Sequence, residues 1–205
     1  MSMVQGSDRK RFFELLESEL FPRLLQEGFV RKGLTFRRIR TPLIHVVECQ
    51  AGSSGQWCYL EMGAHLDFLP QHGGGEYSPA TIEESGCVFR ERLAGDGAST
   101  GGGWVYGASE QESTTSVKAL CSAWESAGSH FFAAHQAFPD DYQAMLDSAD
   151  LEQARAIELL TLARVAANLR RKEQALVLAH LGIERAAPAA SSLRAQLRRF
   201  IESEG

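Results

Sequence analysis

The sequence has few features, such as cysteine pairs, metal-binding motifs or membrane segments, that would stabilise or anchor the protein by means other than its hydrophobic core. Its cysteines are far apart and form no C-x-x-C pair, which excludes a zinc ribbon and a thioredoxin-like redox motif. The longest apolar runs, such as residues 159–165, are far shorter than the roughly 20 residues that a membrane span requires. We therefore expect no membrane segment, no cofactor and no metal, and reduced, mostly buried thiols at Cys49, Cys58, Cys87 and Cys121.

Positive charge is also in short supply. The 21 Lys and Arg residues are outnumbered by 26 Asp and Glu residues, which gives a net charge of −5 and a pI of about 5.7. This balance argues against a surface that attracts nucleic acid or anionic lipid as a whole. Residues 1–10 lead directly into a charged helical pattern without the apolar stretch of a secretory signal, so we expect a cytoplasmic protein.

The first third of the chain predicts a helix followed by an antiparallel meander. Apolar residues recur at three- and four-residue steps over residues 12–25, and the preceding Ser7 and Asp8 can cap this helix. Pro22 should kink or restart the helix, and Gly28 suits a left-handed residue at its end. Three β-rich stretches follow, at residues 30–39, 43–50 and 57–68.

The register of the second hairpin decides which side chains lie opposite one another. We pair Gln50 with Trp57 across a loop at residues 51–56, which sets Glu48 opposite Tyr59. The third stretch alternates strictly, so it has an apolar core face and a second face of mixed character. The core face carries Cys58, Leu60, Met62, Ala64 and Leu66, and the second face carries Trp57, Tyr59, Glu61, Gly63 and His65.

Glycine-rich sequence follows the meander. Residues 70–103 predict loops, most flexible at the triplets 73–75 and 101–103, and they enclose an apolar island at residues 88–93. That island and a second one at residues 104–106 can add strands to the sheet. From Thr114 onward an amphipathic helix should cover the sheet. The predicted fold class is therefore α+β, with an N-terminal helix, an antiparallel sheet meander and a covering helix.

A helical extension completes the predicted architecture. Pro139 marks a break, so we divide the chain into an α+β domain at residues 1–138 and an all-helical extension at residues 139–205. The extension should pack on the body or on a second copy, with a homodimer contact through Leu159, Leu162 and Leu169. Its helices are expected at residues 142–147, 151–169, 172–181 and 191–203.

Several short motifs occur together in the first domain. They are Gly28-Phe-Val-Arg-Lys-Gly-Leu-Thr-Phe-Arg37, the strand Val46-Val-Glu-Cys-Gln50, Glu61-Met-Gly63, Arg90-Glu-Arg-Leu93 and Trp104. Together they resemble a bacterial family known only as a domain of unknown function, whose members carry G-F-x-(R/K)-x-x-x-x-F-x-R after a helix. The resemblance covers roughly residues 9–135, and it implies a fold but no reaction and no catalytic residue. Capping explains Gly28 and strand burial explains Phe36, which leaves Arg37, Gln50, Arg90 and Arg92 without a structural explanation.

The second face of the sheet is the main candidate site. Mixed charge beside an aromatic ring suits a partner protein or a small polar ligand. A half-solvated sheet face without any function carries the same residue types, so this alternative stays open. The candidate residues are Arg38, Glu48, Gln50, Tyr59, Glu61 and His65, together with Arg90 and Arg92.

Two chemical alternatives use the same region. Glu48 and Glu61 can act as paired carboxylates, with His65 as a proton relay, in a small hydrolase or transferase. His65, Asp67 and His72 have the chemistry of metal ligands, but their spacing matches no metal-site signature. We therefore leave the catalytic alternative open and expect no metal.

Basic residues are densest on the first β-rich stretch, at Arg31, Lys32, Arg37, Arg38 and Arg40. Alternation along a strand divides them between two faces, and the overall acidity opposes binding to a polyanion, so we expect no nucleic acid. The leading hypothesis is a non-enzymatic interaction or ligand-binding module, with a toxin-neutralising, immunity-type role as one version of it.

Overall fold

The computed structural model describes residues 2–52, 55–99 and 101–205, and it divides into two compact units, residues 1–135 and 136–205. The first unit combines helices with an antiparallel sheet, and the second is helical. The chain therefore has the α+β fold class that the sequence predicts. Across the described ranges, no helix is long and apolar enough to cross a membrane.

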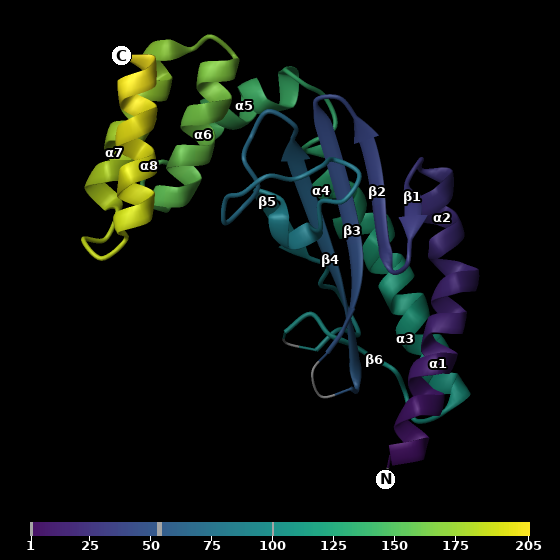
Figure 1. Ribbon diagram of the computed structural model, residues 1–205. Helices are drawn as coiled ribbons and strands as arrows, with labels where there is room; N and C mark the ends of the chain where they lie inside the picture. The colour runs from purple at the N-terminus through teal and green to yellow at the C-terminus, as the bar shows by residue number, and fades with distance from the viewer. Residues whose placement is uncertain (1, 53–54, 100) are drawn as a thin grey trace. The chain divides into compact units, whose positions relative to one another are not determined.

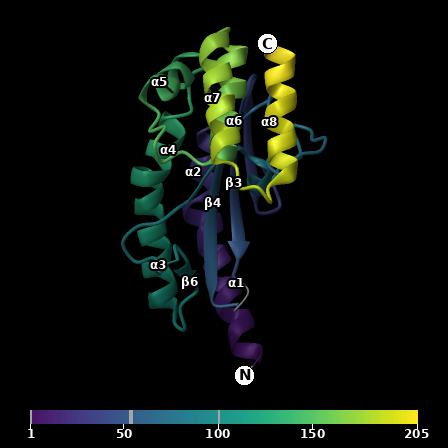
Figure 2. The same cartoon turned by 90° about the vertical axis from the view of Figure 1, so that its left-hand side faces the viewer.

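A six-stranded sheet forms within the described part of the first unit, in the order β1-β2-β3-β4-β5. Every strand pair is antiparallel, and β4 is also paired with β6 near its N-terminal end. Figure 2 shows β3 and β4 as the long strands at its centre. The strands are β1 (Val30–Lys32), β2 (Thr35–Arg40), β3 (Leu43–Ala51), β4 (Trp57–Leu66), β5 (Phe89–Arg92) and β6 (Trp104–Val105).

The first β-rich stretch differs from its prediction. Residues 30–39 were expected to form one strand, and they form the hairpin of β1 and β2 instead. Gly33 turns the chain between these strands with a φ of +66°, a conformation that glycine adopts without a steric penalty. The two apolar islands later in the sequence do form strands, namely β5 and β6.

The register of the β3–β4 hairpin also differs from the prediction. Glu48 lies opposite Glu61, and Gln50 lies opposite Tyr59. The pairing extends further toward the turn than expected, because the amide of Gly52 donates to the carbonyl of Trp57 at 2.8 Å. The shift amounts to two residues, so every side chain of β4 keeps its predicted face. Residues 53 and 54 of the predicted loop lie outside the described residues.

Helices cover one face of the sheet. Helices α1 and α3 lie side by side against it (Figure 1). Rings such as those of Phe12, Phe36, Trp104 and Trp124 are fully or almost fully buried there, and burial of each large apolar side chain contributes about 2 kcal/mol. The helical elements of this unit are α1 (Ser2–Glu19), α2 (Phe21–Gln26), α3 (Glu110–Ala123), a π-helical turn (Trp124–Gly128) and α4 (Ser129–Ala133).

The N-terminal helix breaks where its proline predicts. Pro22 lies in the first turn of α2, where a missing N–H leaves no hydrogen bond unmade. Gly28 ends α2 with a φ of +89°, and the amide of Phe29 donates back across the last turn at 3.0 Å, as a Schellman motif requires. The predicted cap at Ser7 and Asp8 is wrong, because α1 already begins at residue 2.

Residues 67–88 fold over the second face of the sheet, so half of that face is buried rather than solvated. We call these residues the covering segment; it includes a short 3-10 helix, η1 (Glu84–Gly86). Ile44 and Val46 of β3 form a small core with Ile82 and Cys87 of the segment. Gly63 allows the close approach, since a Cβ at this position would lie 2.7 Å from the Cys87 Sγ.

The second unit contains four helices within the described residues. Gly182 was expected to end the third predicted helix, but α7 continues past it. The absence of a side chain at Gly182 instead lets Leu197 pack closely, because a Cβ at this position would lie 2.8 Å from the Leu197 side chain. A homodimer through Leu159, Leu162 and Leu169 stays a prediction, and the first two are already buried within a single chain. The helices are α5 (Asp140–Ser148), α6 (Ala156–Asn168), α7 (Lys172–Arg185) and α8 (Ser191–Glu204).

We expect Gly63→Ala to destabilise the protein by about 2 kcal/mol, because a new methyl group would overpack the contact between β4 and the covering segment. Urea unfolding followed by fluorescence measures this loss. The matched control is Gly101→Ala, whose methyl group meets nothing within 4 Å and should change stability by less than about 0.5 kcal/mol.

The double variant Gly63→Ala/Cys87→Gly removes both Cys87 atoms that crowd the new methyl group. It should lose less stability than the sum of its two single variants. Additive losses would show that the covering segment does not pack on Gly63.

Candidate functional site

Polar side chains gather on the half of the second sheet face that the covering segment leaves open. Cross-strand pairing places Thr35, Glu48, Glu61 and Arg92 in one row across β2, β3, β4 and β5. The next row toward the β3–β4 turn pairs Gln50 with Tyr59. These two residues lie on the same face as Glu48 and Glu61, because each is two residues away from one of them along its strand. We call the following set the Arg92 face: Glu48, Gln50, Tyr59, Glu61 and Arg92.

Arg92 is the side chain of this face that is held in place by the most contacts. Its Nε donates to Glu61 Oε1 at 2.7 Å, and its Nη2 lies 2.5 Å from the same oxygen. Its Nη1 donates to the carbonyl of Gly101 at 3.0 Å, and the guanidinium lies 4.3 Å from the centroid of the Tyr59 ring. The hydrogen bond from Arg92 to Glu61 raises the pKa of the guanidinium above its usual value. The Arg92 side chain is nevertheless 45% exposed, whereas that of Glu61 is 9% exposed.

The second glycine triplet supports Arg92 and Tyr59 directly. A Cβ on Gly102 would lie 2.8 Å from Arg92 Cδ, and one on Gly103 would lie 3.0 Å from the Tyr59 ring. Gly52 touches the other edge of the same ring, where a Cβ would also lie 3.0 Å away. These glycines therefore make room for a packed ring and guanidinium. Residues 101–103 lie in a loop, as predicted, and two of its glycines pack against side chains of the sheet.

Three carboxylates lie near one another between the sheet and the covering segment. The amide of Glu84 donates to Glu48 Oε2 at 3.4 Å, and Glu84 Oε1 lies 3.9 Å from Arg90 Nε. Burial raises the pKa of Glu84 to about 6; Arg90 opposes this rise, and the charges of Glu61 and Glu48 add to it. Glu84 therefore takes up a proton more readily than an exposed carboxylate does.

Arg37, and not Arg38, lies on this face of the sheet. Its Nε donates to the carbonyl of Ile82 at 2.6 Å, and its Nη2 donates to that of Thr81 at 3.4 Å. Arg37 is almost completely buried, so its role is to fasten the covering segment to β2. This contact accounts for one of the residues that capping and strand burial left unexplained.

Arg38 lies on the helical side of the sheet, which corrects the predicted convergence. Its Nε and Nη2 lie 3.2 and 2.9 Å from Nδ1 of His45, and its guanidinium lies over the Phe29 ring at 4.6 Å. His45 Nε2 lies 2.9 Å from the carbonyl of His135. These partners suit a neutral His45 that accepts at Nδ1 and donates at Nε2, and burial lowers its pKa to about 4. Arg38 thus joins the strand to the helices.

His65 is on the second face but is buried under the covering segment. Its Nε2 lies 3.1 Å from the carbonyl of Leu69 and 2.9 Å from the Tyr77 hydroxyl, and burial lowers its pKa to about 4. It stands four residues from Glu61 on one strand, which separates their backbones by about 13 Å at about 3.3 Å per residue. Glu48 and Glu61 are brought together, but the proposed proton relay is not placed beside them.

His65, Asp67 and His72, which were considered as metal ligands and set aside, do not form a metal-binding cluster. Among residues 2–52, 55–99 and 101–205, no group of three His, Cys, Asp or Glu side chains could hold a metal ion. Glu84 and Tyr77 were not among the predicted site residues, and both lie in the stretch interpreted as loop. No local pattern marks them, because their partners are supplied by strands more than ten residues away in sequence.

Comparison with known proteins supports the predicted resemblance. The model of a family described as Domain of unknown function (DUF4304) matches residues 20–134, which is more than half of the chain. This range contains the sheet, the covering segment and the whole Arg92 face. Searches of curated proteins and of solved structures found no match.

His45 and His65, whose pKa values are lowered by burial, predict a pH dependence of stability. Each has a pKa of about 4 in the folded protein and about 6.5 in the unfolded chain, so the unfolded state binds more protons between these values. The free energy of unfolding should be fully present above pH 6.5 and fall toward pH 4, by up to about 3 kcal/mol per histidine. Glu84 acts in the opposite direction between pH 6 and 4.5, because its pKa is raised on folding.

Urea unfolding from pH 7 to pH 4 measures this dependence. His65→Gln should flatten the decline compared with the natural sequence, whatever its effect at pH 7. His130→Gln, which removes an exposed histidine of the same unit, should leave the decline unchanged. An equal slope in His65→Gln and the natural protein would show that His65 is not held neutral by burial.

Proposed function

Because the chain belongs to the DUF4304 family of domains of unknown function, we propose a function from its own geometry: it is a non-enzymatic module that binds another protein through the Arg92 face. Of the two partners that the sequence left open, a protein or a small polar ligand, this proposal takes the protein. It restricts the contact to the open half of the sheet face.

The observation that carries the proposal is a guanidinium that is fixed and still exposed. Arg92 uses three of its N–H groups on Glu61 and Gly101, which leaves two of its five donors for an acceptor outside the chain. Tyr59 and the glycines behind it hold the guanidinium in place before any partner arrives. Tyr and Arg are enriched among the residues that contribute most to binding at protein interfaces. A side chain that is already held in place also loses little conformational entropy when the partner binds.

The charges of the face indicate what the partner should carry. Arg92 can donate to a carboxylate of the partner, and the half-buried Glu48 can accept from a Lys, an Arg or a backbone N–H. Gln50 adds one donor group and one acceptor beside them. A partner surface with both signs of charge matches this face, whereas a polyanion would meet Glu48 and Glu61 and be repelled.

A small-molecule or catalytic role receives less support from this face. A hollow of about 270 Å³ does lie in the covering segment, but its walls come from residues such as Gln71, Tyr77 and Ser85 and not from the Arg92 face. Paired carboxylates alone do not make an acid–base site when the histidine of the proposed relay is buried and hydrogen-bonded elsewhere. All four cysteines are free and buried, which supports placing this module in the cytoplasm.

Affinity capture from the lysate of the organism that encodes the chain, followed by titration with the purified partner, tests the proposal. Arg92→Lys should weaken binding about tenfold, because an ammonium keeps the charge but loses the forked hydrogen bonds and the stacking on Tyr59. Tyr59→Ala should weaken it at least as much. Circular dichroism and thermal unfolding confirm that each variant is folded.

Lys118→Ala is the matched control, because this exposed lysine lies on α3, on the helical side of the sheet. It should bind as the natural protein does. The proposal is wrong if Arg92→Lys and Tyr59→Ala bind every captured partner unchanged. If the partner is toxic, suppression of its toxicity by the natural chain but not by Arg92→Lys identifies the immunity-type version.

A further inference from the structure

Strand β5 forms an edge of the sheet beside the Arg92 face. Among the described strands it pairs with β4 alone, and its residues from Arg90 to Arg92 are exposed. The backbone groups on the free side of an edge strand can bind an extended segment of another chain as an additional strand. This edge is therefore a place where a partner can contact the backbone as well as the side chains.

The ladder between β4 and β5 decides which backbone groups of β5 point outward. The amide of Leu93 donates to the carbonyl of Leu60 at 2.8 Å, so these two residues form a hydrogen-bonded pair. Such pairs alternate along an antiparallel ladder, which makes Glu91 the next residue of β5 that is bonded to β4. The N–H and C=O groups of Arg90 and Arg92 therefore point away from β4. None of these groups has a hydrogen-bond partner among the described residues.

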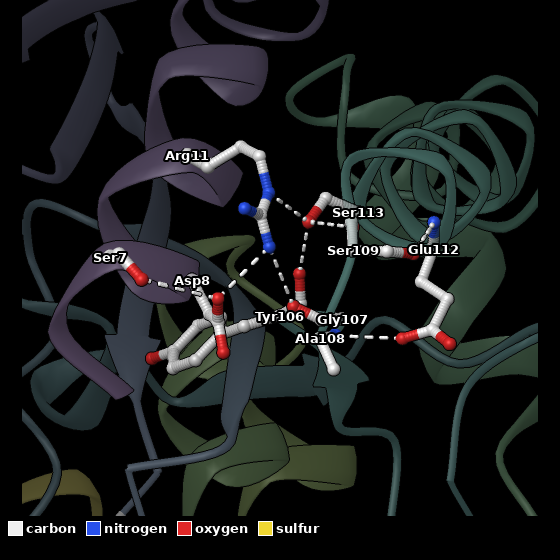
Figure 3. A network of polar contacts seen from close by, with 9 residues as sticks. All are labelled: Ser7, Asp8, Arg11, Tyr106, Gly107, Ala108, Ser109, Glu112 and Ser113. Carbon is white, nitrogen blue, oxygen red and sulfur yellow. Dashed lines mark hydrogen bonds and ion pairs between the residues drawn. The ribbon is translucent and has the colours of Figure 1, made fainter. Parts of the chain in front are cut away.

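The neighbouring part of this edge is closed by the chain itself. Strand β6 lies on the same side of β4 as β5, because β3 occupies the other side. Directly after β6, Ser113 Oγ donates to the carbonyl of Tyr106 at 2.6 Å, and Arg11 Nη2 donates to that of Gly107 at 3.0 Å (Figure 3). Side chains of α1 and α3 thus bind the backbone there. Within the described residues, the outward groups of β5 receive no such contact.

The charges of β5 indicate which segment fits beside it. Arg90 and Arg92 are on the second face of the sheet, and Glu91 between them is on the other. Arg90 contacts the covering segment, where its Nη1 donates to the carbonyl of Ser85 at 3.5 Å and its Nε lies 3.9 Å from Glu84 Oε1, but its side chain is still 37% exposed. In an added strand, side chains directly opposite the two arginines would have Cβ atoms about 5 Å from theirs, so acidic residues at alternate positions match this edge.

A second copy of this chain does not match the edge. Antiparallel pairing of two β5 strands about Glu91 would place Arg90 of each copy opposite Arg92 of the other, and the two Glu91 residues opposite each other. Like charges directly opposite on neighbouring strands are destabilising, and charged side chains are one way in which edge strands avoid self-association. The charges therefore disfavour self-pairing and favour a segment with acidic residues opposite the arginines.

We propose that β5 binds an extended segment of the partner protein, in which acidic residues alternate with uncharged ones, as an additional antiparallel strand. This inference rests on the proposed function, because it specifies how the partner of the Arg92 face is held. Two acidic residues of the segment lie opposite Arg90 and Arg92, exchange backbone hydrogen bonds with them and accept from their guanidinium groups. The antiparallel direction follows the rest of the sheet, in which each described strand pair is antiparallel.

Binding of a blocked hexapeptide of alternating valine and glutamate tests this geometry, followed by the β5 amide signals of the full chain in nitrogen-correlated NMR spectra. Two N-methylated forms separate strand pairing from attraction between charges. The glutamates opposite Arg90 and Arg92 direct their N–H groups to β5, so methylation at the glutamates should weaken binding at least about tenfold. Methylation at the valines, whose N–H groups point to solvent, should change it by less than about threefold.

Two substitutions at one position isolate the backbone contribution of β5. Arg90→Gln removes a charge and should weaken binding of the hexapeptide about threefold. Arg90→Pro also removes the outward N–H group, without removing a bond to β4, and should weaken binding by about a further tenfold. Glu91→Gln is the matched control on the other face of the same strand and should not weaken binding. Circular dichroism and thermal unfolding confirm that each variant is folded.

Hydrogen exchange of the Arg90 and Arg92 amides distinguishes failure of the added strand from failure of the proposed function. Both amides should exchange rapidly in the free chain and become protected by the hexapeptide. No saturable binding, equal binding of the two methylated forms, or protection in the free chain that is lost on dilution would overturn the added strand.

The same amides are then followed in the complex with a captured partner. If they stay unprotected while Arg92→Lys weakens that partner, the added strand is wrong and the proposed function stands. If they are protected and Arg92→Lys changes nothing, the added strand is supported and the proposed role of the Arg92 side chain is wrong.

Discussion

Strand β4 is buried on both faces, and this constraint organises the first unit. Its apolar side chains, from Cys58 to Ala64, join the core beneath the helices, so β4 must present its other side chains to the second face. That face carries two residues that are costly to bury, Glu61 and His65. Each is satisfied by a segment that arrives later in the chain: β5 supplies Arg92 to Glu61, and the covering segment supplies a carbonyl and a hydroxyl to His65.

The two halves of the second face differ because of how these partners are supplied. The covering segment closes its half with backbone carbonyls, a small apolar core and the fastening contact of Arg37. In the other half, the guanidinium of Arg92 compensates Glu61, and the N–H groups that it does not use within the chain stay exposed to solvent. The same need to supply partners to buried polar groups thus produces one half of the face that is covered and one half that stays open for recognition.

Much of this architecture could be predicted from the sequence, because it depends on local patterns. Periodicity of apolar residues gave the helices, alternation gave the two faces of β4, and Pro22 and Gly28 marked the ends of α2. The site was predicted only in part. Alternation decides that Arg37 and Arg38 face opposite ways, but it does not decide which of them shares a face with Glu61; that requires the pairing of β2 with β3 and of β3 with β4. The covering segment carries no periodic signal, since its contacts are turns, single side chains and carbonyls.

The central claim is that Arg92 is held in place before any partner binds. NMR relaxation of its Nε–H group in the free protein tests this most directly. The structure predicts an order parameter close to that of rigid backbone, about 0.8, because Glu61, Gly101 and Tyr59 each restrain the guanidinium. An order parameter below about 0.6, typical of a freely moving side chain, would contradict it.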